Sequence, residues 1–135
     1  MDFVILLRWL HVVGACVLLG TGAGIAFFTL MAHRTRDARF IAQTLRVVVI
    51  ADWVFTASAV VAQPVTGALL AQALGWRLTE GWIEAALALY VLTGAFWLPV
   101  VWMQGRMRRL AQQAADNAEP LPDAYLRLFR LWFAC

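Results

Sequence analysis

Long apolar stretches separated by short polar segments dominate the sequence. Residues 9–33 and residues 85–105 contain no formally charged side chain. Residues 47–76 contain a single one, Asp52. A helix needs about 20 mostly apolar residues to cross a hydrocarbon core of about 30 Å. The pattern therefore predicts three complete membrane-spanning helices, over residues 3–32, 47–74 and 82–105.

A shorter segment at residues 124–135, AYLRLFRLWFAC, combines apolar side chains with two arginines. It is too short to cross a bilayer by itself. One interpretation is an interfacial helix with Arg127 and Arg130 on its polar side. The other is the first part of a fourth spanning helix whose remainder lies beyond Cys135.

The lipid environment of these segments predicts the fold class. Lipid-exposed backbone must satisfy its own hydrogen bonds, which helices do internally, and the sequence lacks the alternating pattern of a transmembrane barrel. We therefore expect an all-α, polytopic transmembrane helical bundle formed by a single domain, residues 1–135.

Composition supports a membrane protein. Hydrophobic residues make up 63% of the chain and charged residues 14%, and the mean hydropathy is +0.74. Soluble domains average about 45–50% apolar and about 25% charged residues. All basic residues are arginines, and the net charge of +3 reflects their position beside the apolar stretches. We expect the lipid bilayer as partner and no nucleic acid.

The arginines also predict orientation. They follow the first and third apolar stretches: Arg34, Arg36 and Arg39, then Arg106, Arg108 and Arg109. The intervening loop holds only Arg77, with Glu80. The positive-inside rule then places the N-terminus outside the bacterial inner membrane. No cleavable signal peptide is recognisable, so the first span is retained.

His11 is the most informative polar residue in these stretches. Ionisable groups inside a membrane are costly and are candidates for function. If the first helix enters the membrane at Phe3, His11 lies about 12 Å deep, and Arg8 snorkels outward. His11 shares a helical face with Gly14 and Gly22, a strip of small residues suited to a flat macrocycle.

A histidine on such a strip can supply an axial nitrogen to the iron of a b-type haem. The alternative is a neutral histidine hydrogen-bonded to another helix. In the haem interpretation His11 is the metal ligand, Arg8 is a propionate or headgroup partner, and Gln63 and Tyr90 line the cofactor pocket.

A second axial ligand is not evident. His33 lies 22 residues beyond His11, about 33 Å along a helix, and is expected to face lipid headgroups. The two cysteines, Cys16 and Cys135, form no CxxC motif, which excludes covalently attached c-type haem.

Asp52 has two interpretations. It is either an interfacial carboxylate beside Trp53 or a group inside the bundle that faces Arg106 or Gln104 of the third helix. Inside the bundle it would form a structural ion pair or handle protons.

Gly20 and Gly24 form a GxxxG pair, which allows another helix to approach closely. They support a competing interpretation, in which the protein is a non-catalytic membrane subunit or assembly factor, either in a homo-oligomer or with a membrane partner subunit. A small transporter component that uses Asp52 ranks third, because no inverted repeat is visible.

Several segments resemble a bacterial family of predicted integral membrane proteins of unknown function. They are RWLH at 8–11, ADW at 51–53, QPVTG at 63–67, WLPV at 97–100 and FRLWF at 129–133. The resemblance covers nearly the whole chain and implies four spanning helices, so that residues 124–135 would begin the fourth.

More distantly, Leu10 and His11 followed by a helix of small residues are similar to copper-resistance-D-like membrane proteins and to HemJ-type protoporphyrinogen oxidase. The latter resemblance implies a b-type haem ligated by His11. The sequence as a whole predicts a small inner-membrane protein whose outer half holds haem b, or a related flat cofactor, against His11.

Overall fold

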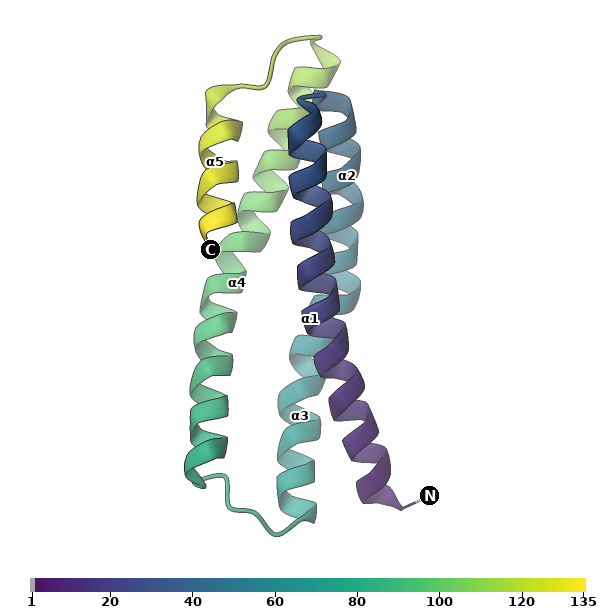
Figure 1. Cartoon of the computed structure of the whole chain (residues 1–135), viewed down its shortest axis with the longest axis vertical. Coiled ribbons are helices and arrows are strands. Elements are labelled where there is room, and N and C mark those ends of the chain that lie inside the picture. The colour runs from purple at the N-terminus through teal and green to yellow at the C-terminus, as the bar shows by residue number, and fades with distance from the viewer. Residues whose placement is uncertain (1) are drawn as a thin grey trace.

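The computed structural model describes residues 2–135, which form helices joined by short loops (Figure 1). The elements are α1 (Phe3–Thr35), α2 (Ala38–Ala51), the π-helical turn η1 (Asp52–Thr56), α3 (Ala57–Ala73), α4 (Gly81–Asp116) and α5 (Asp123–Ala134). Residues 2–135 contain no strand. The predicted all-α fold is thereby confirmed.

Three helices are long and apolar enough to span a membrane: Phe3–Thr35, Ala38–Ala73 and Gly81–Asp116. The second of these is continuous through α2, η1 and α3, so residues 2–135 form four helices in total. The predicted number of complete spans is thus confirmed.

The second long helix begins earlier than its apolar stretch. Arg36 ends α1 in a left-handed conformation with φ 59°, and Asp37 then caps α2. The Asp37 carboxylate accepts hydrogen bonds from the backbone N–H groups of Arg39 at 2.9 Å and Phe40 at 3.2 Å. This cap satisfies donors that a helix start leaves free. Hydropathy predicts which part of a helix lies in the lipid, whereas the cap at Asp37 determines where the helix begins.

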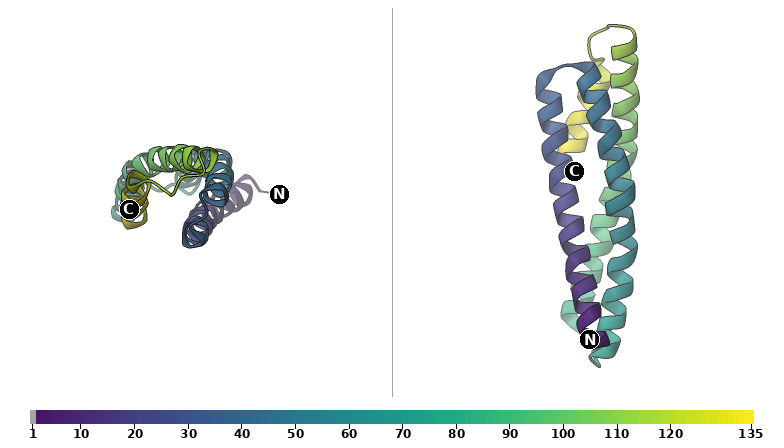
Figure 2. Two further views of the ribbon diagram at one scale, coloured as in Figure 1. Left: turned by 90° about the horizontal axis from the view of Figure 1, so that it is seen from above. Right: turned by 90° about the vertical axis from the view of Figure 1, so that its right-hand side faces the viewer.

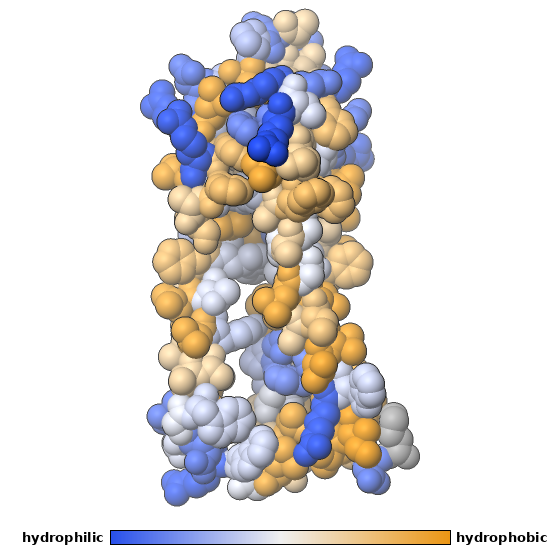
Figure 3. All heavy atoms as spheres, viewed as in Figure 1, coloured by the Kyte–Doolittle hydropathy of each residue, from blue (hydrophilic) through white to orange (hydrophobic). Residues whose placement is uncertain are grey.

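The best-packed part of the bundle is the half that contains α2, α5 and the C-terminal half of α4 (Figure 1). Its buried core draws on α1, α2, α4 and α5, with Ile41, Leu45, Met107, Ala111, Tyr125 and Phe129 among its members. Nine arginines belong to this half: Arg34, Arg36, Arg39, Arg46, Arg106, Arg108, Arg109, Arg127 and Arg130. Hydrophilic side chains accordingly gather at this end in Figure 3.

α5 runs along the bundle axis beside α4 and ends near mid-height (Figure 1). It is 12 residues long and buries Tyr125, Phe129 and Trp132. His33 of α1 lies against it, with its ring stacked on Phe129 at 3.6 Å and its Nδ1 3.3 Å from the Tyr125 hydroxyl. His33 therefore joins α1 to α5 within the bundle, rather than facing headgroups as expected.

The other half of the bundle is more open. Viewed from above, the helices form an arc (Figure 2). Below the end of α5, α4 runs beside α3 but apart from it (Figure 1), and the molecular surface is hollowed between α4 and α1 (Figure 3). The candidate site lies in this half.

Candidate functional site

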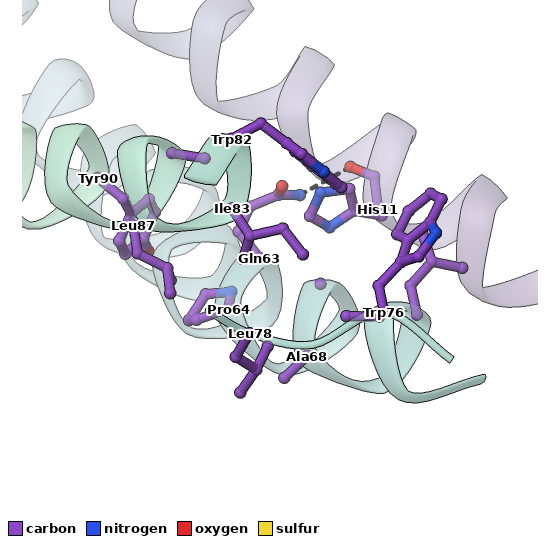
Figure 4. Close-up of a pocket in the computed structure, with 14 residues that line it drawn as sticks. His11, Gln63, Pro64, Ala68, Trp76, Leu78, Trp82, Ile83, Leu87 and Tyr90 are labelled. Atoms are coloured by element: carbon purple, nitrogen blue, oxygen red, sulfur yellow. Dashed lines mark hydrogen bonds between the residues drawn. The ribbon is translucent and has the colours of Figure 1, made fainter. Parts of the chain in front are cut away.

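A cavity of about 550 Å³ lies between α3 and the N-terminal part of α4, with His11 of α1 at its wall (Figure 4). Most of its lining is apolar. The lining residues are His11, Gln63, Pro64, Gly67, Ala68, Leu70, Ala71, Trp76, Leu78, Trp82, Ile83, Ala86, Leu87 and Tyr90. A volume of this order lies within the range of small-molecule and cofactor sites, about 300–1,000 Å³.

The His11 ring is oriented by Thr66. His11 Nδ1 lies 2.9 Å from Thr66 Oγ1, and the same hydroxyl lies 2.7 Å from the carbonyl oxygen of Ala62. A hydroxyl has one proton to donate, and a carbonyl can only accept. Thr66 therefore donates to Ala62 and accepts from the Nδ1–H group of His11. In the neutral imidazole this leaves the lone pair on Nε2.

Gly67 makes room for the imidazole. A Cβ atom at this position would lie 3.1 Å from His11 Cε1, closer than an ordinary van der Waals contact. The absence of a side chain at Gly67 thus allows the ring to lie against α3, where Thr66 reaches it. The adjacent pair, Thr66 and Gly67, sets both the hydrogen bond and the position of the ring.

Gln63 lies in the same wall of the cavity and links α3 to α1 by a hydrogen bond. Its Nε2 donates to the backbone carbonyl of His11 at 2.8 Å (Figure 4), and the residue is buried. A Cβ atom at Gly14 would overlap Gln63 Nε2. The small-residue strip beside His11 is therefore covered here by Gln63, and the open volume lies on the α4 side instead.

Tyr90 fastens α4 to α3 across the cavity. Pro64 has no N–H group, so the carbonyl of Val60, four residues earlier, lacks its usual helical donor. The Tyr90 hydroxyl donates to that carbonyl. The proline, which α3 accommodates without ending, thus creates the acceptor that holds α4 in place.

Trp76 and Trp82 lie at the loop end of the cavity. Their rings pack edge to face, with centroids 5.2 Å apart and an interplanar angle of 88°. Trp76 follows α3 and Trp82 belongs to the first turn of α4. This pair joins the two helices where the cavity approaches the expected membrane interface, a depth at which tryptophan is enriched.

The structure brings three of the four predicted cofactor-binding residues to this cavity, namely His11, Gln63 and Tyr90. Arg8 is not among its lining residues. It is exposed beside Ile5, Trp9 and Val12. Within residues 2–135 the lining of the cavity includes no arginine or lysine, so the expected propionate partner is missing from the wall.

The predicted polar pair is also separated. Asp52 is buried and its Oδ1 accepts from Trp97 Nε1 at 3.2 Å. Arg106 is exposed, with its guanidinium 5.8 Å from the ring centroid of Trp102. The structure thus pairs Asp52 with a tryptophan rather than with Arg106, while Gln104 lines the same small cavity as Asp52.

Gly20 and Gly24 do not mediate packing within residues 2–135. A Cβ atom at either position would have no heavy atom within 4 Å. The close helix approach is made instead at Gly14 and Gly67. A packing role for Gly20 and Gly24 would require a partner outside residues 2–135.

Sequence reasoning missed Thr66 and Gly67, which orient His11. Their only signal was the QPVTG segment at 63–67, where a proline, a hydroxyl and a glycine interrupt an apolar helix.

The described residues do not form a metal site by themselves. No group of three or more histidine, cysteine, aspartate or glutamate side chains among residues 2–135 is arranged to hold an ion. His11 offers one nitrogen, which suits only a metal that brings its other ligands with it.

Comparisons with known proteins identify a family. A family described as "Predicted integral membrane protein (DUF2269)" matches residues 5–135. The search of curated proteins and the search of solved structures found no match.

Proposed function

The chain belongs to the DUF2269 family of predicted integral membrane proteins, and we propose that it binds a flat, largely apolar redox cofactor in the cavity beside His11, with b-type haem as the specific candidate. One observation carries this proposal. The Nδ1–H group of His11 is engaged by Thr66, so the remaining lone pair is on Nε2 of a residue that lines a cavity of about 550 Å³.

The residues fit haem in two respects. Histidines that ligate a metal donate their other ring N–H to a fixed acceptor, which sets tautomer and orientation, and Thr66 is such an acceptor. The apolar and aromatic lining matches the faces of a porphyrin, with Trp76, Trp82 and Leu87 among its members. Haem would supply electron-transfer or oxygen chemistry here, while the chain itself orients the imidazole through Thr66.

Among the described residues that line the cavity, His11 would be the sole axial ligand. His33 is stacked on Phe129 at the other end of α1. With Arg8 outside the cavity wall, the propionates would have to reach solvent or headgroups.

The test is the visible spectrum of the full chain purified in mild detergent, before and after addition of haemin, in oxidised and dithionite-reduced states. We expect a Soret band in the wild type that His11→Ala removes. His33→Ala is the matched control, because it deletes the other histidine, and it should keep the band. A colourless wild type after haemin addition would contradict the proposal.

A second candidate function rests on Gly20 and Gly24. A Cβ atom added at either glycine would have no neighbour within 4 Å, and the two form the GxxxG spacing that favours close helix association. In this case the protein is a packing subunit, in a homo-oligomer or with another membrane protein. Disulfide crosslinking of Gly20→Cys in membranes should then give a covalent dimer, and a variant at exposed Leu89 of α4 serves as control.

The arrangement of arginines supports a location in the inner membrane with the N-terminus outside. Nine of them lie in the half of the bundle that holds α5, while Arg8 and Arg77 belong to the opposite half. The positive-inside rule assigns the arginine-rich end to the cytoplasm. A membrane-impermeant maleimide should label Leu78→Cys in intact spheroplasts and should leave Asn117→Cys unlabelled until the membrane is opened.

A further inference from the structure

Three arginines from two helices line one groove at the arginine-rich end of the bundle. The groove lies between α2 and the C-terminal part of α4, which run side by side there (Figure 2). It has a volume of about 520 Å³, and its lining residues are Ala42, Arg46, Arg108, Arg109, Gln112 and Gln113. None of them lines the cavity beside His11, so this groove is a separate feature of the molecule.

Helical spacing explains how these side chains reach the groove. On α2, Ala42 and Arg46 are four residues apart, which places them on one face of the helix. On α4, Arg108 and Arg109 precede Gln112 and Gln113 by the same four residues. Ala42 is small and buried, so it leaves space between the two helices. The guanidinium groups therefore approach the groove from both of its walls.

The charge balance of the groove favours an anion. Its lining carries three arginines and, among residues 2–135, no aspartate or glutamate. Asp116, one turn beyond Gln112, instead accepts a hydrogen bond from Gln112 Nε2 at 2.8 Å. A concave site lined by one sign of charge attracts the opposite sign. Guanidinium groups match phosphate in particular, because their paired N–H groups can bind two of its oxygens at once.

The position of the groove along the helices corresponds to the headgroup level of a membrane. Arg46 directly precedes the apolar stretch at 47–76, and Arg108 and Arg109 closely follow the apolar stretch at 85–105. If these stretches fill the hydrocarbon core, the three guanidinium groups lie at its boundary. Basic pockets between spanning helices at this level bind anionic lipid headgroups. The positive-inside rule explains arginines at one end of a bundle, but it does not require three of them to line one groove.

Apolar side chains continue both helices from the groove toward the hydrocarbon. Ile50 lies one turn beyond Arg46 on α2, and Trp102 lies two turns before Arg109 on α4. Each therefore shares a helical face with its arginine. Their exposed fractions are 54% and 57%. A ligand with acyl chains can contact these side chains, whereas a free phosphate ion cannot.

We propose that this groove binds the headgroup of an anionic phospholipid. Arg46 on one wall and Arg108 and Arg109 on the other hold the phosphate diester. The Gln113 amide donates to a further headgroup oxygen, while Gln112 is engaged by Asp116. The acyl chains extend along the exposed surfaces of Ile50 and Trp102.

The test is native mass spectrometry of the full chain in a non-ionic detergent, titrated with phosphatidylglycerol. Phosphatidylcholine with the same acyl chains is the reference lipid, because it carries the phosphate without net charge. We expect the wild type to prefer phosphatidylglycerol. The double variant Arg108→Gln, Arg109→Gln should bind it about 30-fold more weakly, the combined effect expected for two basic residues at a lipid headgroup. Its binding of phosphatidylcholine should not change.

The matched control removes the same charge from the same end of the bundle. Arg127→Gln combined with Arg130→Gln changes two exposed arginines of α5 that do not line the groove, and it should keep the affinity of the wild type. Equal losses in the two double variants would show general attraction to charge and would overturn the proposal. Equal affinity of the wild type for the two lipids would do the same.

Two further measurements separate the remaining possibilities. Inorganic phosphate in large molar excess should not displace phosphatidylglycerol, and displacement would assign the groove to a free anion instead of a lipid. Arg46→Gln changes the opposite wall and should weaken binding several-fold, which keeps the proposal testable if the α4 double variant does not fold. His11→Ala should leave lipid binding unchanged, so this site and the proposed haem site fail independently.

Discussion

The Nδ1 atom of His11 lies 2.9 Å from the hydroxyl oxygen of Thr66, although 55 residues separate the two in sequence. This bond joins α1 to α3 within the apolar part of the bundle. It also determines which imidazole nitrogen retains a lone pair. The proposed cofactor chemistry depends on this one contact more than on any other.

Replacing Thr66 with valine should weaken haem binding by about ten-fold or more, because loss of a ligand-orienting hydrogen bond typically costs about 10- to 100-fold in metal affinity. Valine has nearly the same shape and no acceptor. Haemin titration monitored at the Soret band measures the effect. Thr93→Val is the matched control, since the Thr93 hydroxyl is exposed and donates to the Leu89 carbonyl of its own helix. An unchanged affinity in Thr66→Val would show that the bond does not orient the ligand.

Replacing Tyr90 with phenylalanine should lower the free energy of unfolding by about 1–3 kcal/mol, because the Val60 carbonyl then loses its donor. The same substitution in a Pro64→Ala background tests whether Pro64 is the reason that the Val60 carbonyl depends on Tyr90. Alanine restores the missing N–H group, so Tyr90→Phe should cost less there. Denaturant unfolding in mixed micelles, analysed as a double-mutant cycle, measures the difference. Equal costs in both backgrounds would contradict the role assigned to Pro64.

Replacing Gly14 with alanine should destabilise the protein by about 1–3 kcal/mol, the usual cost of overpacking, because the new Cβ atom overlaps Gln63 Nε2. Gly94→Ala is the control. It lies within α4, where an added Cβ atom would meet nothing within 4 Å, and alanine favours a helix over glycine by about 0.5–1 kcal/mol. Thermal unfolding should therefore move in opposite directions for the two variants, and a shift of the same sign in both would be inconsistent with the packing described.

Replacing Phe129 with alanine should release α5 from the bundle, because Phe129 stacks on His33 at 3.6 Å and belongs to the buried core. Large-to-small substitutions of this kind typically cost about 3–5 kcal/mol. Limited trypsin digestion should then cleave faster after Arg127 and Arg130. Phe133→Ala removes an exposed ring and should leave the cleavage rate near that of the wild type. Comparable rates in all three proteins would show that α5 is not held by this contact.

Much of the fold could be predicted from the sequence, because membrane-spanning helices are set by the length of apolar stretches. Residues 9–33 and 85–105 predicted two of them directly. The start of α2 lies outside the apolar stretch because the Asp37 cap, rather than hydropathy, determines it.

The candidate site was predicted only in part. His11, Gln63 and Tyr90 have similar depths in their helices, and depth can be counted along the chain, so their meeting at one cavity follows. The direction in which Arg8 points and the partner that Asp52 finds depend instead on how each helix is rotated about its axis. Apolar residues occur all around these helices, so the sequence carries little information on rotation. The pairing of Asp52 with Trp97 could therefore not be predicted.

The most direct test of the central claim is chemical rescue of the axial ligand. In His11→Gly the protein should lose the Soret band of the haemin-loaded wild type, and added imidazole should restore it, because free imidazole can occupy the space of the missing side chain and supply the same nitrogen. A His11→Gly protein whose spectrum matches the wild type without imidazole, or does not respond to it, would contradict the claim that His11 Nε2 is the ligand.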